Sequence, residues 1–229
     1  MKRKGETVID REYLEPGQFV ESDTLEIIAF AQQAAGHARD DISRSVSLYE
    51  AVRDQITYDP YDRLDHAESC SAKRALMRNR GYCIPKAALL VACARALGIP
   101  GRLGFADVRD HLASPRLIEA NEDDVFRWHA YAELHLEGKW VKATPAFDML
   151  LCNRVGIEPL QFDGRNDSIF HPYDRRNRKH MEYVLDRGRF ADVPFEAILA
   201  TWRTHSPRLL DESYYCRAKS FIEEVRLRS

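Results

Sequence analysis

The chain has 229 residues, and its 34 Lys and Arg against 36 Asp and Glu give a formal net charge of −2. Apolar residues make up 45% of the chain and charged residues 31%, and the sparse Gly and Pro (11 and 10) exclude collagen-like and low-complexity classes. The near-neutral charge gives no general electrostatic reason to bind nucleic acid or an anionic membrane. No stretch approaches the roughly 20 apolar residues of a membrane-spanning helix, and the charged start lacks the apolar run of a signal peptide. We therefore expect a cytoplasmic protein that forms one domain over residues 1–229.

The first half of the chain has the periodicity of helices. Leucine, isoleucine and alanine recur at helical spacing after Asp23, and Glu26 stands where a capping box requires it. Further helices are predicted over 45–55 and 71–78. The most apolar helix is predicted over 86–97, after a first-turn Pro85 and before Gly98, and its apolar faces indicate central burial.

The second half of the chain alternates as strands do. Strands are predicted over 101–108, 126–136 and 139–144, and the last two form a hairpin through a two-residue Glu137-Gly138 turn. Residues 109–124 are predicted to be a polar loop. Residues 145–194 are predicted to be long loops with a short strand over 181–185, followed by helices near 195–204 and 211–226. Helices followed by a meander of strands favour an α+β fold.

The chain has an odd number of widely spaced cysteines: Cys70, Cys83, Cys93, Cys152 and Cys216. No Cys-x-x-Cys occurs, so a zinc ribbon or a thioredoxin-type site is not supported. Free thiols in a reducing compartment are the simplest interpretation. The sequence implies no metal and no cofactor.

Cys83 stands directly before the most apolar helix, in the segment Gly-Tyr-Cys-Ile-Pro of residues 81–85. A thiol there faces the unpaired N–H groups and the positive end of the helix dipole. Both favour the nucleophilic thiolate, and the same N–H groups suit the oxyanion formed when the thiolate attacks a carbonyl. Most buried cysteines are instead small apolar fillers, and Cys93, inside the helix, is interpreted in that way.

Strand alternation divides residues 127–135 into an apolar face and a face that holds His129, Tyr131, Glu133 and His135. A lone histidine in a strand is more often a structural residue than a catalytic one. His129 ends this polar row and is the candidate general base for a nearby thiol, whereas Glu133 is expected to be a structural or solvated residue. A catalytic imidazole usually needs an orienting acceptor.

These segments resemble the transglutaminase-like superfamily. Gly-Tyr-Cys at 81–83, the following Ala- and Leu-rich helix and Leu-Gly-Ile-Pro-Gly-Arg at 97–102 are similar to its nucleophile segment, and residues 128–141 are similar to its histidine hairpin. The likeness covers about residues 45–150. It implies a papain-like, transglutaminase-type core, with N-terminal helices and a central buried helix on an antiparallel sheet. Residues 150–229 are then a loop-rich extension with C-terminal helices.

The resemblance also implies that Cys83 is the nucleophile and His129 the general base. The family usually has Asp where this chain has Thr144, at the end of the return strand. A Thr hydroxyl accepts a hydrogen bond from imidazole but cannot stabilise imidazolium by charge. We therefore predict Asp148, four residues later, as the third catalytic residue, with Thr144 as the alternative orienting group.

The sequence thus predicts a thiol enzyme that acts on an amide bond (peptide, isopeptide or glutamine-type) through a cysteinyl thioester, by hydrolysis or by acyl transfer. Its expected substrate is a peptide, a protein or a small amide. Two alternatives stay open. One is a non-catalytic module that binds a peptide or protein with a degenerate triad, and the other is an acyltransferase that uses a thioester donor. The sequence leaves the oligomeric state open.

Overall fold

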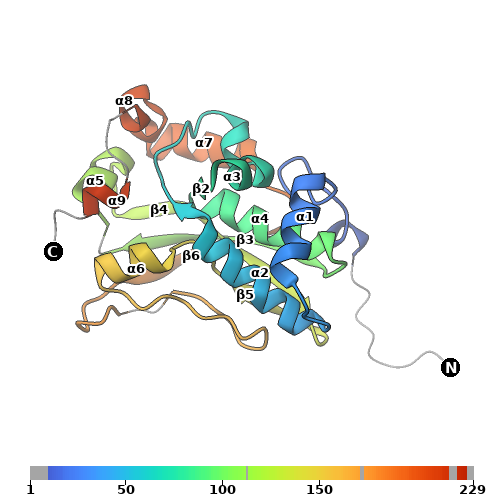
Figure 1. Ribbon diagram of the computed structural model, residues 1–229. Helices are drawn as coiled ribbons and strands as arrows, with labels where there is room; N and C mark the ends of the chain where they lie inside the picture. The colour runs from blue at the N-terminus through green and yellow to red at the C-terminus, as the bar shows by residue number, and fades with distance from the viewer. Residues whose placement is uncertain (1–9, 112, 171–172, 217–220, 226–229) are drawn as a thin grey trace.

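The computed structural model describes residues 10–111, 113–170, 173–216 and 221–225, and Figure 1 shows its helices and strands. It is an α+β fold in which the N-terminal helices precede most of the sheet, as predicted. In chain order the elements are η1 (Arg11–Tyr13), α1 (Leu25–Ala35), α2 (Asp41–Gln55), β1 (Thr57–Tyr58), η2 (Ala67–Cys70), α3 (Ala72–Arg78), β2 (Arg80–Gly81), α4 (Cys83–Ala96), β3 (Gly101–Asp110), α5 (Pro115–Asn121), β4 (Val125–Leu136), β5 (Lys139–Ala143), α6 (Met149–Val155), β6 (Met181–Phe190), α7 (Phe195–His205), η3 (Pro207–Leu210), α8 (Glu212–Tyr215) and α9 (Phe221–Glu224).

Helix α4 lies at the centre of the fold, as its composition predicts. Every residue from Ile84 to Arg95 is buried, because α4 packs on the sheet with one side and on α1, α2 and α3 with the others. A helix that is apolar all round is stable only in such a setting. Burial of side chains such as Leu89 and Leu90 stabilises the fold by about 1.5–3 kcal/mol each.

The main sheet has four antiparallel strands in the order β5-β4-β3-β6. The predicted Glu137-Gly138 turn joins β4 to β5, and both residues have positive φ (48° and 83°), as a tight hairpin turn of this type needs. Strand β6 is twice as long as the predicted strand over 181–185, because it pairs with β3 through two register shifts that the alternation pattern does not reveal.

Two helices lie in segments that the sequence predicts as loops. Helix α5 begins at Pro115 and is capped by Ser114, whose hydroxyl accepts the Leu117 N–H at 3.1 Å. Helix α6 ends at Gly156, which has a φ of 78°. Both corrections have one cause: a dense set of Pro, Gly, Asp and Asn residues marks helix ends as well as loops.

Two smaller predictions about helix ends are also wrong. The first helix is not capped by Asp23, because it begins at Leu25 after Thr24, whose side chain makes no capping bond. The predicted C-terminal helix over 211–226 is replaced by the short helices α8 and α9 within the described residues. In the part of the chain that the structure describes, no helix is both long and apolar enough to span a bilayer.

Gly104 on β3 provides a test of how closely the sheet is packed. A Cβ on Gly104 would lie 2.3 Å from the Tyr131 ring, which crosses this position from β4. We expect Gly104→Ala to lower the free energy of unfolding by about 1–3 kcal/mol, because the ring has to shift within a packed layer. Urea unfolding measures the loss. Adding Tyr131→Ser should recover part of it, and equal losses with and without that second substitution would contradict the steric explanation.

Candidate active site

Cys83 is the first residue of α4 and directly follows Tyr82, whose side chain makes polar contacts that fix this part of the chain. The Tyr82 hydroxyl lies 3.4 Å from the Cys70 sulfur and 3.4 Å from the Ser69 hydroxyl. Gly81, the residue before Tyr82, pairs with Tyr58 in the short parallel β1–β2 ladder. The chain entering the helix is thereby fixed on two sides, which sets the direction of the Cys83 side chain.

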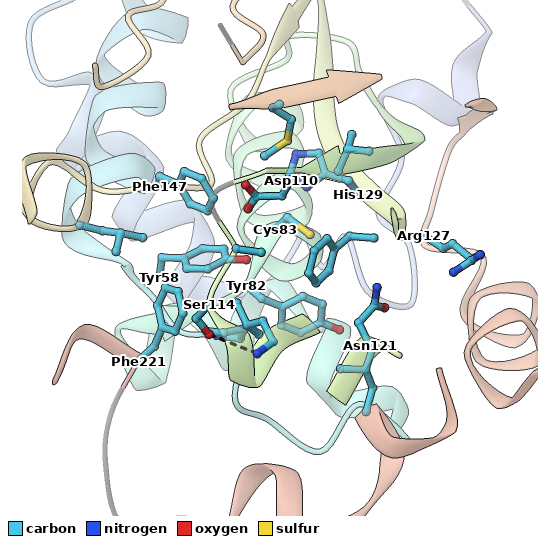
Figure 2. Close-up of a pocket in the computed structure, with 18 of the residues that line it drawn as sticks. Tyr58, Tyr82, Cys83, Asp110, Ser114, Asn121, Arg127, His129, Phe147 and Phe221 are labelled. Atoms are coloured by element: carbon cyan, nitrogen blue, oxygen red, sulfur yellow. Dashed lines mark hydrogen bonds between the residues drawn. The ribbon is translucent and has the colours of Figure 1, made fainter. Parts of the chain in front are cut away.

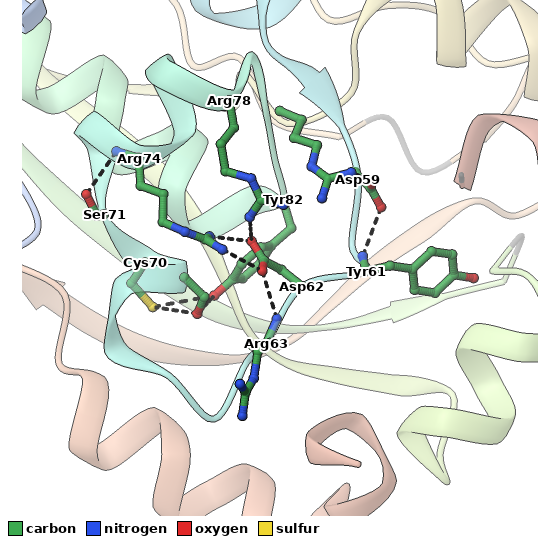
Figure 3. A network of polar contacts seen from close by, with 11 residues as sticks. Asp59, Tyr61, Asp62, Arg63, Cys70, Ser71, Arg74, Arg78 and Tyr82 are labelled. Atoms are coloured by element: carbon green, nitrogen blue, oxygen red, sulfur yellow. Dashed lines mark hydrogen bonds and ion pairs between the residues drawn. The ribbon is translucent and has the colours of Figure 1, made fainter. Parts of the chain in front are cut away.

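A charged network holds the loop that precedes α3. Asp62 accepts a bidentate contact from Arg74 and a 3.0 Å bond from Arg78, both on α3 (Figure 3). This loop supplies Pro60 and Leu64 to the wall of the pocket in front of Cys83. The network therefore shapes the pocket without lining it.

His129 lies on β4 next to a bulge. Ala106 of β3 pairs with His129, and Val108 pairs with Phe126, so β4 has one residue more than β3 between these pairs. Trp128 takes up the extra length with a φ of 64°, a left-handed conformation that bulky residues rarely adopt. Strain of this kind persists only where the surroundings hold it, and it gathers at functional sites.

The surroundings hold Trp128 at three points. Its backbone N–H donates to Asp107 at 3.1 Å, and its indole N–H donates to Thr201 of α7 at 2.9 Å. Arg187 of β6 forms a bidentate ion pair with Asp107, with both bonds at 2.7 Å, and stacks its guanidinium over the indole ring. This bulge network of Asp107, Trp128 and Arg187 thus determines where the next residue, His129, points.

Cys83 and His129 open into one pocket. It has a volume of about 130 Å³ and mostly apolar walls, and among the five cysteines, all within the described residues, Cys83 alone lines it. Figure 2 shows the Cys83 sulfur inside this pocket, with Asp110 and His129 on one side of it. The sulfur also lies within hydrogen-bond reach of the backbone N–H of Ala130, the residue after His129. The two residues that the sequence predicts as nucleophile and base are brought together.

Three polar residues of the pocket were missed by the sequence analysis. Asp110 lies at the end of β3, His180 directly precedes β6, and Tyr58 comes from β1. Figure 2 shows the Tyr58 hydroxyl directed toward Cys83. Their sequence neighbourhoods are ordinary loop and strand-end segments, so no spacing pattern marks them.

The thiol of Cys83 is more basic than its helix position suggests. Burial in the apolar pocket raises the pKa of Cys83 to about 11, although the N–H groups of Ala130, Ile84 and Cys83 itself each lower it. The predicted effect of the helix N-terminus is thus present, but burial outweighs it, and the expectation of a thiolate at rest is wrong. At neutral pH this thiol holds its proton.

His129 is buried as a neutral imidazole. It is 7% exposed, and the Phe170 ring lies 5.3 Å from it between ring centroids. Burial lowers the pKa of His129 to about 4. Among the described residues, Nε2 has no hydrogen-bond partner. A neutral imidazole with an open nitrogen can accept a proton at pH 7.

Neither candidate for the third catalytic position lines the pocket. The Asp148 carboxylate accepts the Leu151 N–H at 2.9 Å, which caps α6, and the Tyr58 N–H at 2.8 Å. Thr144 is buried, and its backbone carbonyl accepts a bond from the Tyr49 hydroxyl at 3.2 Å. The side chain of Asp148 therefore binds backbone N–H groups, and neither of these two bonds reaches the His129 ring.

Two other residues, Glu133 and Cys93, were interpreted from the sequence as non-catalytic, and their surroundings agree with that interpretation. Glu133 is 2% exposed and is held between Arg102 (2.7 Å) and Arg189 (2.9 Å), so it is a buried ion-pair residue. Cys93 is fully buried within α4, where burial raises the pKa of its thiol further than that of Cys83.

Comparison with known families settles the family. A model of the transglutaminase-like superfamily matches residues 28–145, which is more than half of the chain and includes both Cys83 and His129. The chain belongs to the transglutaminase-like superfamily. Members of the transglutaminase-like superfamily are typically cysteine-dependent enzymes, among them proteases and acyltransferases. No curated protein sequence matches the chain significantly.

Three solved structures are similar to this superfamily member. A candidate cysteine protease from Cytophaga hutchinsonii is 22% identical with a TM-score of 0.44, over 60% of this chain and 43% of its own. A candidate protease from Parabacteroides distasonis is 16% identical with a TM-score of 0.38, over 58% of this chain and 24% of its own. The arylamine N-acetyltransferase from Salmonella typhimurium is 12% identical with a TM-score of 0.49, over 83% and 72%. The chain thus spans less than half the length of the first two proteins.

The high pKa of Cys83 gives a testable pH dependence. The thiolate is the form that iodoacetamide attacks, so below a pKa of about 11 the alkylation rate of Cys83 should rise about tenfold per pH unit. We expect a continuous rise from pH 7 to pH 10, measured by mass spectrometry of the peptide that contains Cys83. A Cys216→Ser background removes the exposed thiol, and Cys83→Ala gives the blank. A plateau that begins below pH 8.5 would contradict the assigned burial effect.

Proposed function

We propose that this protein is an acyl-transfer enzyme that attacks an amide carbonyl with Cys83 and uses His129 as the general base. Sγ forms a bond to the carbonyl carbon while its proton moves to Nε2 of His129. The proton then passes to the nitrogen of the leaving amine as the C–N bond breaks, and a thioester remains on Cys83. Water or a second amine attacks the thioester and completes hydrolysis or transfer.

The observation that carries this proposal is the shared pocket of Cys83 and His129, with the sulfur within reach of the Ala130 N–H. The N–H groups of Cys83 and Ile84 at the start of α4 are available to the oxyanion, because the first amides of a helix have no partner within it. Family membership supports the same chemistry, since cysteine-dependent catalysis is typical of the superfamily.

The protonation states favour proton transfer during attack over a preformed ion pair. The pKa of Cys83, raised to about 11, and that of His129, lowered to about 4, leave both groups neutral at pH 7. Both shifts come first from burial, so a bound substrate that excludes further water keeps both groups neutral. His129 must therefore remove the thiol proton as the S–C bond forms.

Trapping the acyl-enzyme tests the proposal directly. The protein, in a Cys216→Ser background, is mixed with p-nitrophenyl acetate, and intact mass is followed together with nitrophenolate release. We expect a burst and an added acetyl group on Cys83. Cys83→Ala removes both, and Cys93→Ala, a buried thiol on the same helix, leaves both unchanged. Absence of any adduct on Cys83 would overturn the proposal.

A second candidate function has one observation in its favour. Thr144 occupies the position where the family usually has Asp, and among the described residues nothing pairs with Nε2 of His129. A pocket with an incomplete triad suits a module that binds a peptide or protein without acting on it. Peptide binding that Cys83→Ala leaves intact, together with no acyl-enzyme, would favour this function.

A further inference from the structure

We propose that the cavity beside Cys83 takes the acyl half of the substrate and is built for a small apolar acyl group, about the size of a benzene ring. This substrate class rests on the proposed function, since it assigns the group that the thioester on Cys83 would carry. The leaving amine would lie on the opposite side of the carbonyl, away from the cavity.

The cavity walls come from parts of the chain that are far apart in sequence. Buried apolar side chains line it from the loop before α3, from α5, from α7, from η3 and from the end of α9: Leu64, Leu117, Trp202, Leu209 and Val225. Tyr214 and Phe221 also line the pocket, and the Tyr61 ring packs edge to face against both of them. Arg116 lies over the Tyr61 ring at 3.9 Å and pairs with Glu224, which ties α9 to α5. These side chains make the cavity an apolar end of the pocket.

Two polar side chains at this end of the pocket, Ser114 and Asn121, are already paired. Figure 2 shows Ser114 and Asn121 on the side of Cys83 opposite Asp110 and His129. The Asn121 amide donates to the carbonyls of Asp123 (2.8 Å) and Val125 (3.0 Å), and its oxygen accepts a bond from Ser206 at 2.9 Å. The Ser114 hydroxyl accepts the helix-capping bond described above. A peptide group placed there would leave its own N–H or carbonyl unpaired, so the cavity disfavours peptide-like acyl groups.

The size of the cavity selects among apolar groups. An apolar cavity of about 150 Å³ holds one benzene molecule, and the whole pocket, of which this cavity is the apolar end, has a volume of about 130 Å³. An acetyl group would leave most of that volume empty, and a decanoyl chain would exceed it. A benzoyl group or a chain of about six carbons fits.

A series of p-nitrophenyl esters tests the inference in the Cys216→Ser background. Attack by Sγ forms the S–C bond, breaks the C–O bond and releases p-nitrophenolate, while the thiol proton passes to His129. The series is acetate, hexanoate, decanoate, benzoate and N-acetylglycinate, and each rate is divided by that of free cysteine with the same ester. We expect hexanoate and benzoate to acylate Cys83 about tenfold faster than acetate or more, and decanoate and N-acetylglycinate to gain nothing over acetate.

Two neighbouring residues of α5 provide matched variants. Leu117 is 8% exposed and lines the cavity, whereas Ile118 is 39% exposed and does not. Leu117→Trp should remove the advantage of hexanoate and benzoate over acetate, and Ile118→Trp should leave that advantage as it is in the wild type. Leu117→Ala, which enlarges the cavity, should make esters with longer acyl chains the fastest to acylate Cys83. This variant also tests the inference if Leu117→Trp does not fold.

The outcomes separate this inference from the proposed function. Acylation of Cys83 with equal corrected rates for all esters, or a preference for N-acetylglycinate, would overturn the acyl cavity alone. No acylation of Cys83 by any ester would overturn the proposed function and the acyl cavity with it. A preference for hexanoate and benzoate that Leu117→Ala leaves unmoved would place apolar recognition elsewhere and also overturn the inference.

Discussion

Replacing His129 by Gln is expected to lower the rate at which p-nitrophenyl acetate acylates Cys83 at pH 7 by about 10²–10⁴-fold, the range for loss of a general base. The reason is the neutral resting state. With the pKa of Cys83 raised to about 11, almost no thiolate is present at pH 7, so attack depends on a base that takes the proton during the step. Gln keeps a similar volume at this buried position but cannot act as that base.

The size of the loss should depend on pH. As the pH rises toward 11, Cys83 ionises without help, so the wild-type and His129→Gln rates should converge. His135→Gln is the matched control, because His135 shares the polar face of β4 but packs against Trp140 outside the pocket. Stopped-flow nitrophenolate release between pH 6 and pH 10.5 measures both variants. A loss that is constant with pH would contradict the base role and indicate a structural effect.

Much of this site could be predicted from the sequence because its residues mark helix and strand boundaries. The burial of α4 follows from a run of Ala, Leu and Val, and Cys83 stands at the first position of that run. The hairpin of β4 and β5 follows from alternation and the Glu137-Gly138 turn, which together place His129 on its strand. Local patterns of this kind predict the helices and strands and their order along the chain. Here they also point to Cys83 and His129, which line the same pocket in the folded chain.

The electrostatics of the site could not be predicted in the same way. The pKa of Cys83 depends on how completely α5, α7 and the C-terminal segments exclude water, and those elements are distant in sequence. Helix position alone predicts the opposite direction of the shift. Asp148 illustrates the same limit, because its bonds to Leu151 and Tyr58 depend on a helix in a segment whose composition is typical of loops.

The bulge in β4 also has no sequence signature. A left-handed residue in a bulge is usually Gly, which has no Cβ to clash, but this chain has Trp128 there. The conformation is imposed by contacts from β3, β6 and α7 rather than by the residue itself. Alternation along β4 is therefore regular from His129 to Leu134 and is interrupted at the bulge, where the extra residue enters the strand.

Replacing Asp107 by Ala should both destabilise the fold and slow acylation, because Asp107 is a positioning residue for His129. The substitution leaves Arg187 without its partner and the Trp128 N–H without an acceptor. Loss of one partner of a buried ion pair costs about 3–5 kcal/mol. Because the Arg187 side chain is 23% exposed, we expect about 3 kcal/mol here, measured by urea unfolding.

The effect on catalysis follows from the strained backbone. Without Asp107, Trp128 can leave its φ of 64°, and the adjacent imidazole then moves relative to the Cys83 sulfur. Misplacement of a catalytic group by about 1 Å lowers rates by about 10²-fold, so acylation at pH 7 should fall by about 10- to 100-fold. Alkylation of Cys83 by iodoacetamide at pH 10 needs no base and should stay unchanged.

Glu133→Ala separates positioning from stability. Glu133 is on the same strand and is also a buried carboxylate held by arginines, Arg102 and Arg189, so its removal should cost a similar free energy of unfolding. Its carboxylate pairs with Arg102 and Arg189 rather than with a residue of the bulge network, so acylation at pH 7 should keep its wild-type rate in the folded protein. If Glu133→Ala and Asp107→Ala slow acylation equally, the bulge network has no special role in orienting His129. If only Asp107→Ala does so, and its rate approaches that of the wild type at high pH, the network holds the base in place.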